Sequence, residues 1–143
     1  MHYHGYLWQG SGEERQYRVP ETYPDHPAFG LSPLPPQRVC WWLLKPASMV
    51  EGTWEDPAEA VAWLAARYRA VFPRIRTERP EWYAPRARKG FWLDSLDQGT
   101  DLVCAHWLQD GDGFTAAVVC CPNRWEDLPC PVTGAPAPPA ERM

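Results

Sequence analysis

Three cysteines late in the chain and two histidines at its start are the first residues whose types could do chemistry. Cys120 and Cys121 are adjacent, Cys130 follows them, and His2 and His4 are separated by one residue. A zinc site needs about four nitrogen or sulfur ligands in a tetrahedron. In a strand, His2 and His4 share a face, whereas Cys120 and Cys121 point to opposite faces and cannot both bind one ion without a bulge. The pattern favours small buried thiols, so we predict no metal and no cofactor and keep a structural zinc module as an alternative.

Cys104 and His106 form a second candidate, because a cysteine beside a base can act as a nucleophile. The two residues lie on one face of a predicted strand, with side chains about 7 Å apart from the strand rise. That separation is too long for a hydrogen bond. The chain contains no G-x-S-x-G, H-E-x-x-H or glycine-rich phosphate motif. A small enzyme with a pocket near Cys104 and His106 therefore stays open as an alternative, without an assigned reaction.

The third candidate is a basic segment. Residues 67–89 carry eight lysines and arginines and two acidic residues, although the net charge of the whole chain is −4. Cations beside aromatic rings can contact phosphate and stack on bases, but the acidic chain argues against nucleic acid. We predict a surface for a protein partner or an anionic small molecule, and keep a plain solvated face as the alternative. It comprises Arg74, Arg76, Arg79, Trp82, Tyr83, Arg86 and Arg88.

Two helices are predicted to position these groups. Asp56 can cap a helix whose first residue is Pro57, and apolar residues then recur at 3.6-residue spacing until Pro73 ends the pattern. A second helix begins at Pro85, and Gly99 stands where the residue after a helix commonly adopts a left-handed conformation.

Five segments are predicted to be strands: 3–8, 38–44, 47–53, 101–109 and 114–121. The second and third could pair as one hairpin, and the last two form another across Asp110-Gly111-Asp112-Gly113. Hairpins with grouped helices predict an α+β fold, with a small antiparallel sheet of about four or five strands packed on one face by two helices.

Eight of the nine tryptophans divide by their place in the predicted elements. Four fall within elements and are predicted to be core residues: Trp41, Trp63, Trp92 and Trp107. Four lie near element ends or in loops, where the pattern does not decide their exposure: Trp8, Trp54, Trp82 and Trp125.

The length of 143 residues fits one domain, which we place at 1–131. It includes a proline-rich loop at 19–37 and precedes a disordered proline- and alanine-rich tail at 132–143. No apolar run reaches the roughly 20 residues of a membrane span, and the start lacks the features of an export signal. The odd number of cysteines favours reduced thiols. We expect a small cytoplasmic binding or accessory protein, with its oligomeric state open.

Overall fold

Four strands form one antiparallel sheet in the computed structural model, which describes residues 1–80 and 85–135 and all of their side chains except those of 85–87. The strands are β1 (His2–Ser11), β2 (Gly52–Trp54), β3 (Leu102–Trp107) and β4 (Asp112–Cys121). Their order across the sheet is β2-β1-β4-β3, so the first and last strands of the chain are neighbours at its centre. This arrangement confirms the predicted α+β fold with an antiparallel sheet.

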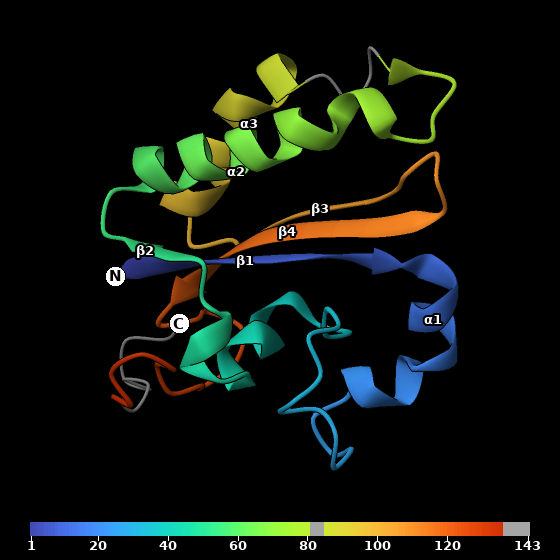
Figure 1. Ribbon diagram of the computed structural model, residues 1–143. Coiled ribbons are helices and arrows are strands. Elements are labelled where there is room, and N and C mark those ends of the chain that lie inside the picture. The colour runs from blue at the N-terminus through green and yellow to red at the C-terminus, as the bar shows by residue number, and fades with distance from the viewer. Residues whose placement is uncertain (81–84, 136–143) are drawn as a thin grey trace.

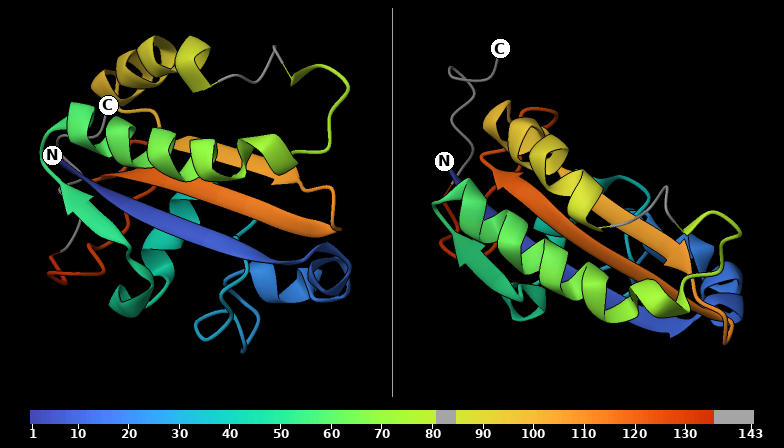
Figure 2. Two further views of the ribbon diagram at one scale, coloured as in Figure 1. Left: turned by 45° about the horizontal axis from the view of Figure 1, so that its top comes forward. Right: turned by 90° about the horizontal axis from the view of Figure 1, so that it is seen from above.

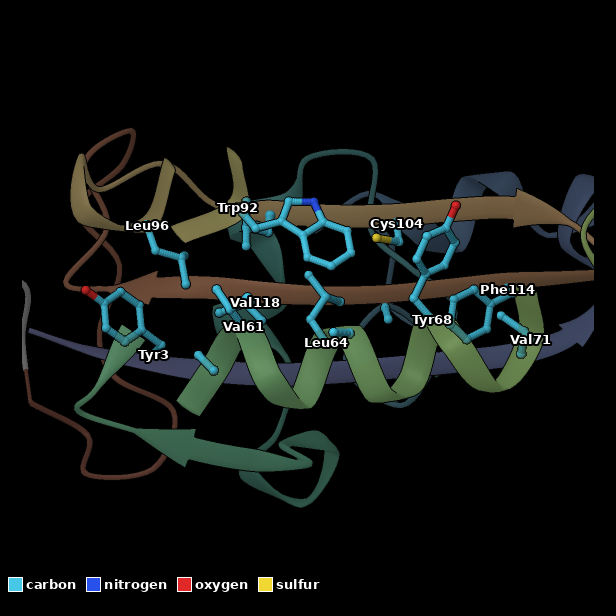
Figure 3. Close-up of a cluster of buried hydrophobic side chains, with 14 of the residues drawn as sticks. Tyr3, Val61, Leu64, Tyr68, Val71, Trp92, Leu96, Cys104, Phe114 and Val118 are labelled. Carbon is cyan, nitrogen blue, oxygen red and sulfur yellow. The ribbon is translucent and has the colours of Figure 1, made fainter. Parts of the chain in front are cut away.

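One face of the sheet is covered by α2 (Pro57–Val71) and α3 (Pro85–Asp97), which lie on the same side of the strands (Figure 1; Figure 2). The Asp56 carboxylate accepts a hydrogen bond of 2.8 Å from the Ala58 backbone N–H, which confirms the predicted cap of α2. Gly99 has φ = 80° and its N–H donates to the Leu96 carbonyl, as predicted for the end of α3. Leu64 and Trp92 meet between the helices and the sheet (Figure 3).

The opposite face is covered by short segments that contain no long helix. They are α1 (Gly12–Tyr17), the 3₁₀ helices at Val19–Thr22, Val39–Leu44 and Ala47–Met49, and the chain after β4. The Tyr6 ring of β1 stacks on Trp42, with 4.8 Å between ring centroids. Trp8 and Val119 are buried on the same face. We refer to the two sides of the sheet as the helix face and the loop face.

The strand predicted at 38–44 is wrong, because residues 39–44 form a 3₁₀ helix that packs on the loop face. A short apolar run does not distinguish a buried strand from a buried helix by its periodicity. Its buried residues, Cys40, Trp42 and Leu43, fit a helix with about three residues per turn. The hairpin predicted for 38–44 and 47–53 is therefore wrong too. Residues 47–49 form another 3₁₀ helix, and β2 pairs with β1.

The loop predicted at 19–37 begins with one 3₁₀ helix and continues as turns. Phe29 and Leu34 are buried in it, whereas Tyr23 and Leu31 are exposed. The buried Lys45 amine holds the loop, since Nζ donates hydrogen bonds of 2.8 and 2.7 Å to the carbonyls of residues 29 and 32. The proline-rich segment therefore packs on the domain.

The β3–β4 hairpin is confirmed, and Gly111 in its turn has φ = 92°. Within the predicted tail, Gly134 and Ala135 are joined to Cys130 by backbone hydrogen bonds of 2.8 and 2.9 Å. The remainder of that prediction, residues 136–143, lies outside the described residues. None of the described helices has the length and apolar character needed to cross a bilayer.

Candidate metal centre

Strands β1 and β4 bring three potential metal ligands together at one end of the sheet. His2 pairs directly with Cys121 in the antiparallel register, so both side chains point to the loop face. His4 follows two residues later on β1 and points the same way. Cys120 packs into the core of the helix face, whereas Cys121 belongs to the loop face, as expected for adjacent residues in a strand.

The segment after β4 carries Cys130 back to this end of the sheet (Figure 1, drawn in red). Buried Asn123 fixes the start of the segment, because its Nδ2 donates hydrogen bonds of 3.0 Å to both carboxylate oxygens of Asp101. Glu126 fixes its middle by accepting a 3.0 Å hydrogen bond from Trp41 Nε1. Two links to other elements thus position the loop that supplies Cys130.

The four side chains converge on one point. One ligand atom from each of His2, His4, Cys121 and Cys130 lies within 4.8 Å of the other three. The two histidine Nε2 atoms are 3.1 Å apart, and Cys130 Sγ is 3.5 Å from each of them. Usual zinc–ligand bond lengths imply edges of about 3.3 Å for N–N, 3.6 Å for N–S and 3.8 Å for S–S in a tetrahedral site. The observed N–N and N–S separations approach those edges.

His4 is oriented by a contact outside the cluster. Its Nδ1 lies 2.8 Å from the Thr53 hydroxyl on β2, the direct partner of His4 in the β1–β2 ladder. Without an ion, an Nε2–H of His4 can donate to Cys130 Sγ, 3.5 Å away. A metal at Nε2 would select the other tautomer, in which the proton is on Nδ1 and is donated to the Thr53 hydroxyl. Histidines that bind metals are commonly held in this way. Burial lowers the pKa of fully buried His4, which favours the neutral ring that a metal requires.

The two thiols differ in acidity. Burial raises the pKa of Cys130, but hydrogen bonds from the hydroxyl and backbone of Thr133 and from His2 and His4 outweigh it and bring the pKa to about 5. Burial and the neighbouring Cys130 raise the pKa of Cys121 to about 12. At neutral pH these shifts favour a thiolate at Cys130 beside a thiol at Cys121. The thiolate is the form that binds metals, and a cation placed between the two favours loss of the second proton.

The predicted arginine and tryptophan surface is only partly described. Arg74 pairs with Asp110, and the Arg76 guanidinium lies 5.4 Å from the centroid of the Trp107 ring. Arg79 is exposed and Arg88 is half-buried. Trp82 and Tyr83 and the side chain of Arg86 lie outside the described residues. This surface stays a prediction.

Cys104 and His106 are packed under the helices. Burial raises the pKa of Cys104 to about 12, so the thiol lacks the thiolate character of a nucleophile. The His106 ring stacks on Tyr68, with 5.4 Å between centroids. A cavity borders His106 without including Cys104 among its lining residues. Cys104 and His106 therefore do not line this cavity together.

Trp92 is buried as predicted, but Trp107 is 41% exposed because it points away from the helices at the edge of the sheet. Trp8 is buried against the backbone of Gly10 and Gly113, whose lack of side chains makes room for its ring. Trp125 is exposed, and Trp41, Trp54 and Trp63 are partly buried.

Sequence reasoning identified the histidine pair and the cysteines but did not select Cys121 and Cys130 as partners of His2 and His4. The missing information is the pairing of β1 with β4, which joins residues from the two ends of the chain. In comparisons with known proteins, no family model, no curated protein and no solved structure matches this chain.

Proposed function

We propose that the protein is a small zinc-binding module in which His2, His4, Cys121 and Cys130 hold a structural Zn²⁺ ion. The observation that carries this proposal is the convergence of the four ligand atoms within 4.8 Å of one another. These residues come from β1, from the end of β4 and from the segment beyond it. The donors are two imidazoles and two thiols, so the cluster is not a chance group of surface carboxylates.

The donor set favours zinc in a structural role. Two sulfur and two nitrogen ligands in tetrahedral geometry are typical of zinc. Four protein ligands complete the usual coordination shell, whereas catalytic zinc keeps a position for water or substrate. His4, Cys121 and Cys130 are buried, which also fits a closed site.

The ion would fasten the start of the chain to the segment that follows β4. That segment has no strand or helix of its own between Pro122 and Ala135, so few regular hydrogen bonds hold it. A bound ion adds free energy to the folded state because the unfolded chain does not preform the site. We therefore assign the zinc the role of holding the covering of the loop face.

A cytoplasmic location and a binding or accessory role belong to the same proposal. All five cysteines are free thiols, which fits a reducing compartment. A closed zinc site would act by shaping a surface for a protein partner or an anionic ligand. The residues that would contact such a partner or ligand are distinct from the four proposed zinc ligands.

The test is the metal content of protein purified without chelator, together with titration by Co²⁺ as a spectroscopic probe. We expect about one zinc per chain and, after replacement, the visible bands of tetrahedral Co²⁺ with thiolate ligands. Cys121→Ser and Cys130→Ser should each lower zinc affinity by about 100-fold or more, because each removes a thiolate ligand.

Cys120→Ala is the matched control, since Cys120 neighbours Cys121 in sequence but faces the helices. This variant should retain zinc with unchanged affinity. Wild-type protein that is isolated without zinc and binds neither Zn²⁺ nor Co²⁺ at micromolar concentration would overturn the proposal. So would equal metal affinity of the Cys120 and Cys121 variants.

A further inference from the structure

A second site lies on the loop face, at the end of the sheet away from the cysteines. A cavity of about 330 Å³ opens between α1 and the edge strand β3, and its lining includes Arg15, Gln16, Val19, Ala105 and Trp107. The segments that cover the loop face do not extend over this strand, because Val103 and Trp107 remain 46% and 41% exposed there. The cavity shares no residue with the candidate metal centre.

Arg15 is the unusual group in this cavity. Its guanidinium carbon lies 5.4 Å from the centroid of the Trp8 ring, and the residue is half-buried. Other arginines of the same face and its surroundings, Arg18, Arg38 and Arg74, each have a carboxylate partner. Among the residues that the structure describes, no acidic side chain forms an ion pair with Arg15.

A partly desolvated cation without a counter-charge is unfavourable, and an anionic ligand would relieve that cost. Burial lowers the pKa of Arg15 from its ordinary value of 12.5, with no acidic neighbour acting against the shift. An arginine side chain stays charged at neutral pH under such conditions. Its planar group suits a carboxylate, which can accept two parallel hydrogen bonds.

Another part of the lining is the indole of Trp107. The Trp107 ring lies so close to the Gly12 backbone that a Cβ at position 12 would stand 1.9 Å from it. Arg76 lies over the ring with its guanidinium carbon 5.4 Å from the centroid. These contacts restrain the indole, and Val19 and Ala105 extend the apolar lining. This part of the lining therefore suits a flat apolar body.

We propose that this cavity binds a small organic carboxylate, with its carboxylate on the Arg15 guanidinium and its flat apolar body against Trp107. The cavity volume lies near the lower end of the range of about 300 to 1,000 Å³ found for small-molecule sites, so the ligand is compact. This site would hold the anionic ligand expected from the sequence near Arg76 of the basic segment. The cation that binds the ligand, Arg15, lies outside that segment.

The experiment compares 2-naphthoate with its uncharged analogue 2-naphthamide, by calorimetry and by the indole N–H signals in NMR spectra. Wild-type protein should bind the carboxylate at least about tenfold more tightly than the amide, because only the carboxylate forms charge-assisted hydrogen bonds with Arg15. Arg15→Gln should remove this preference and leave the affinity for the amide unchanged. Trp107→Ala should weaken both ligands.

Arg74→Gln is the control for a general effect of charge, since Arg74 is an exposed arginine paired with Asp110. It should bind both probes as the wild type does. Equal affinities for the carboxylate and the amide, absence of binding at millimolar concentration, or an equal loss in Arg74→Gln and Arg15→Gln would each overturn the proposal. Zinc content is measured in the same samples, so failure here is distinguishable from failure of the metal site.

Discussion

The helix face and the loop face of the sheet bury different kinds of side chain. Under α2 and α3 the buried cluster consists of apolar and aromatic residues and two cysteines. The buried polar and charged side chains that the structure describes belong instead to the loop face and to the segments that cover it. They are His4, Thr22, Ser32, Lys45, Thr115 and Asn123.

This difference follows from the covering elements. An amphipathic helix satisfies its own backbone groups and presents one apolar stripe, so hydrophobic burial alone can hold α2. The segments over the loop face contain helices of at most six residues, and their turns leave backbone groups that need partners. Side chains such as Lys45 and Asn123 supply those partners: Lys45 Nζ donates to the Phe29 carbonyl, and Asn123 Oδ1 accepts from the Trp125 N–H. The loop face therefore depends on a few specific links, of which the proposed zinc site is one.

Removing zinc is expected to produce the largest difference between the faces. A strong chelator added to the metal-loaded protein should lower the free energy of local opening at residues 130–135 and around His2 by about 5 kcal/mol or more, because the ion adds its binding free energy to that region. Backbone amides of α2 should keep their protection. Hydrogen exchange measured by NMR resolves the two regions. The Cys120→Ala protein should respond as the wild type does, and equal loss of protection on both faces would show that they are not separate units.

Leu64→Ala tests the helix face by itself. Leu64 is fully buried between α2 and the sheet (Figure 3), and its truncation leaves a cavity. We expect the free energy of unfolding to fall by about 3 kcal/mol, as for other buried leucines. Phe91→Ala is the control, because Phe91 is 70% exposed on α3 and should change stability by less than about 0.5 kcal/mol.

The measurement is urea denaturation, followed by zinc titration of the same samples. Zinc affinity should be the same in Leu64→Ala as in the wild type. A large fall in zinc affinity would mean that packing on the helix face determines the geometry of the metal centre.

The contrast between the faces also explains what could be read from the sequence. The start of α2 was predictable because Asp56, Pro57 and the apolar spacing act within a few residues of one another. The 3₁₀ helix at Val39–Leu44 was missed because its conformation is set by packing on Tyr6 and its neighbours, not by a local pattern. Trp107 was predicted to be a core residue, but it lies on the edge strand β3, where the loop face of the sheet is not covered.

The same limit applies to the candidate sites. The face shared by His2 and His4 follows from strand geometry, but their distance to Cys130 depends on three strands and on the links made by Asn123 and Glu126. The sequence did not single out Arg15, because its lack of a carboxylate partner is a property of the tertiary structure. The density of charge predicted a binding surface at residues 67–89, but Arg74 in that segment forms an ion pair with Asp110 of the same chain.

A smaller effect is expected from Lys45, which holds the proline-rich part of the loop face. Its side chain is 2% exposed, and its amine donates to two backbone carbonyls and lies 3.9 Å from the centroid of the Phe29 ring. Lys45→Met keeps most of the side-chain volume but leaves both carbonyls without this donor. We expect the free energy of unfolding at pH 7 to fall by about 1–3 kcal/mol. Lys89→Met is the control, since Lys89 is the only other lysine and is exposed on α3.

The pH dependence of Lys45 separates its charge from its hydrogen bonds. Burial lowers the pKa of Lys45 in the folded protein from the ordinary 10.5 to about 8, although Glu21 acts weakly in the other direction. Between these two values the unfolded chain binds more protons than the folded protein, so the free energy of unfolding rises with pH in this window. The difference in stability between the wild type and Lys45→Met should therefore widen from about pH 8 to pH 10.5 in urea denaturation. A difference that stays constant would mean that the amine stays charged and paired with both carbonyls up to pH 10.5, so that burial does not lower its pKa in the folded protein.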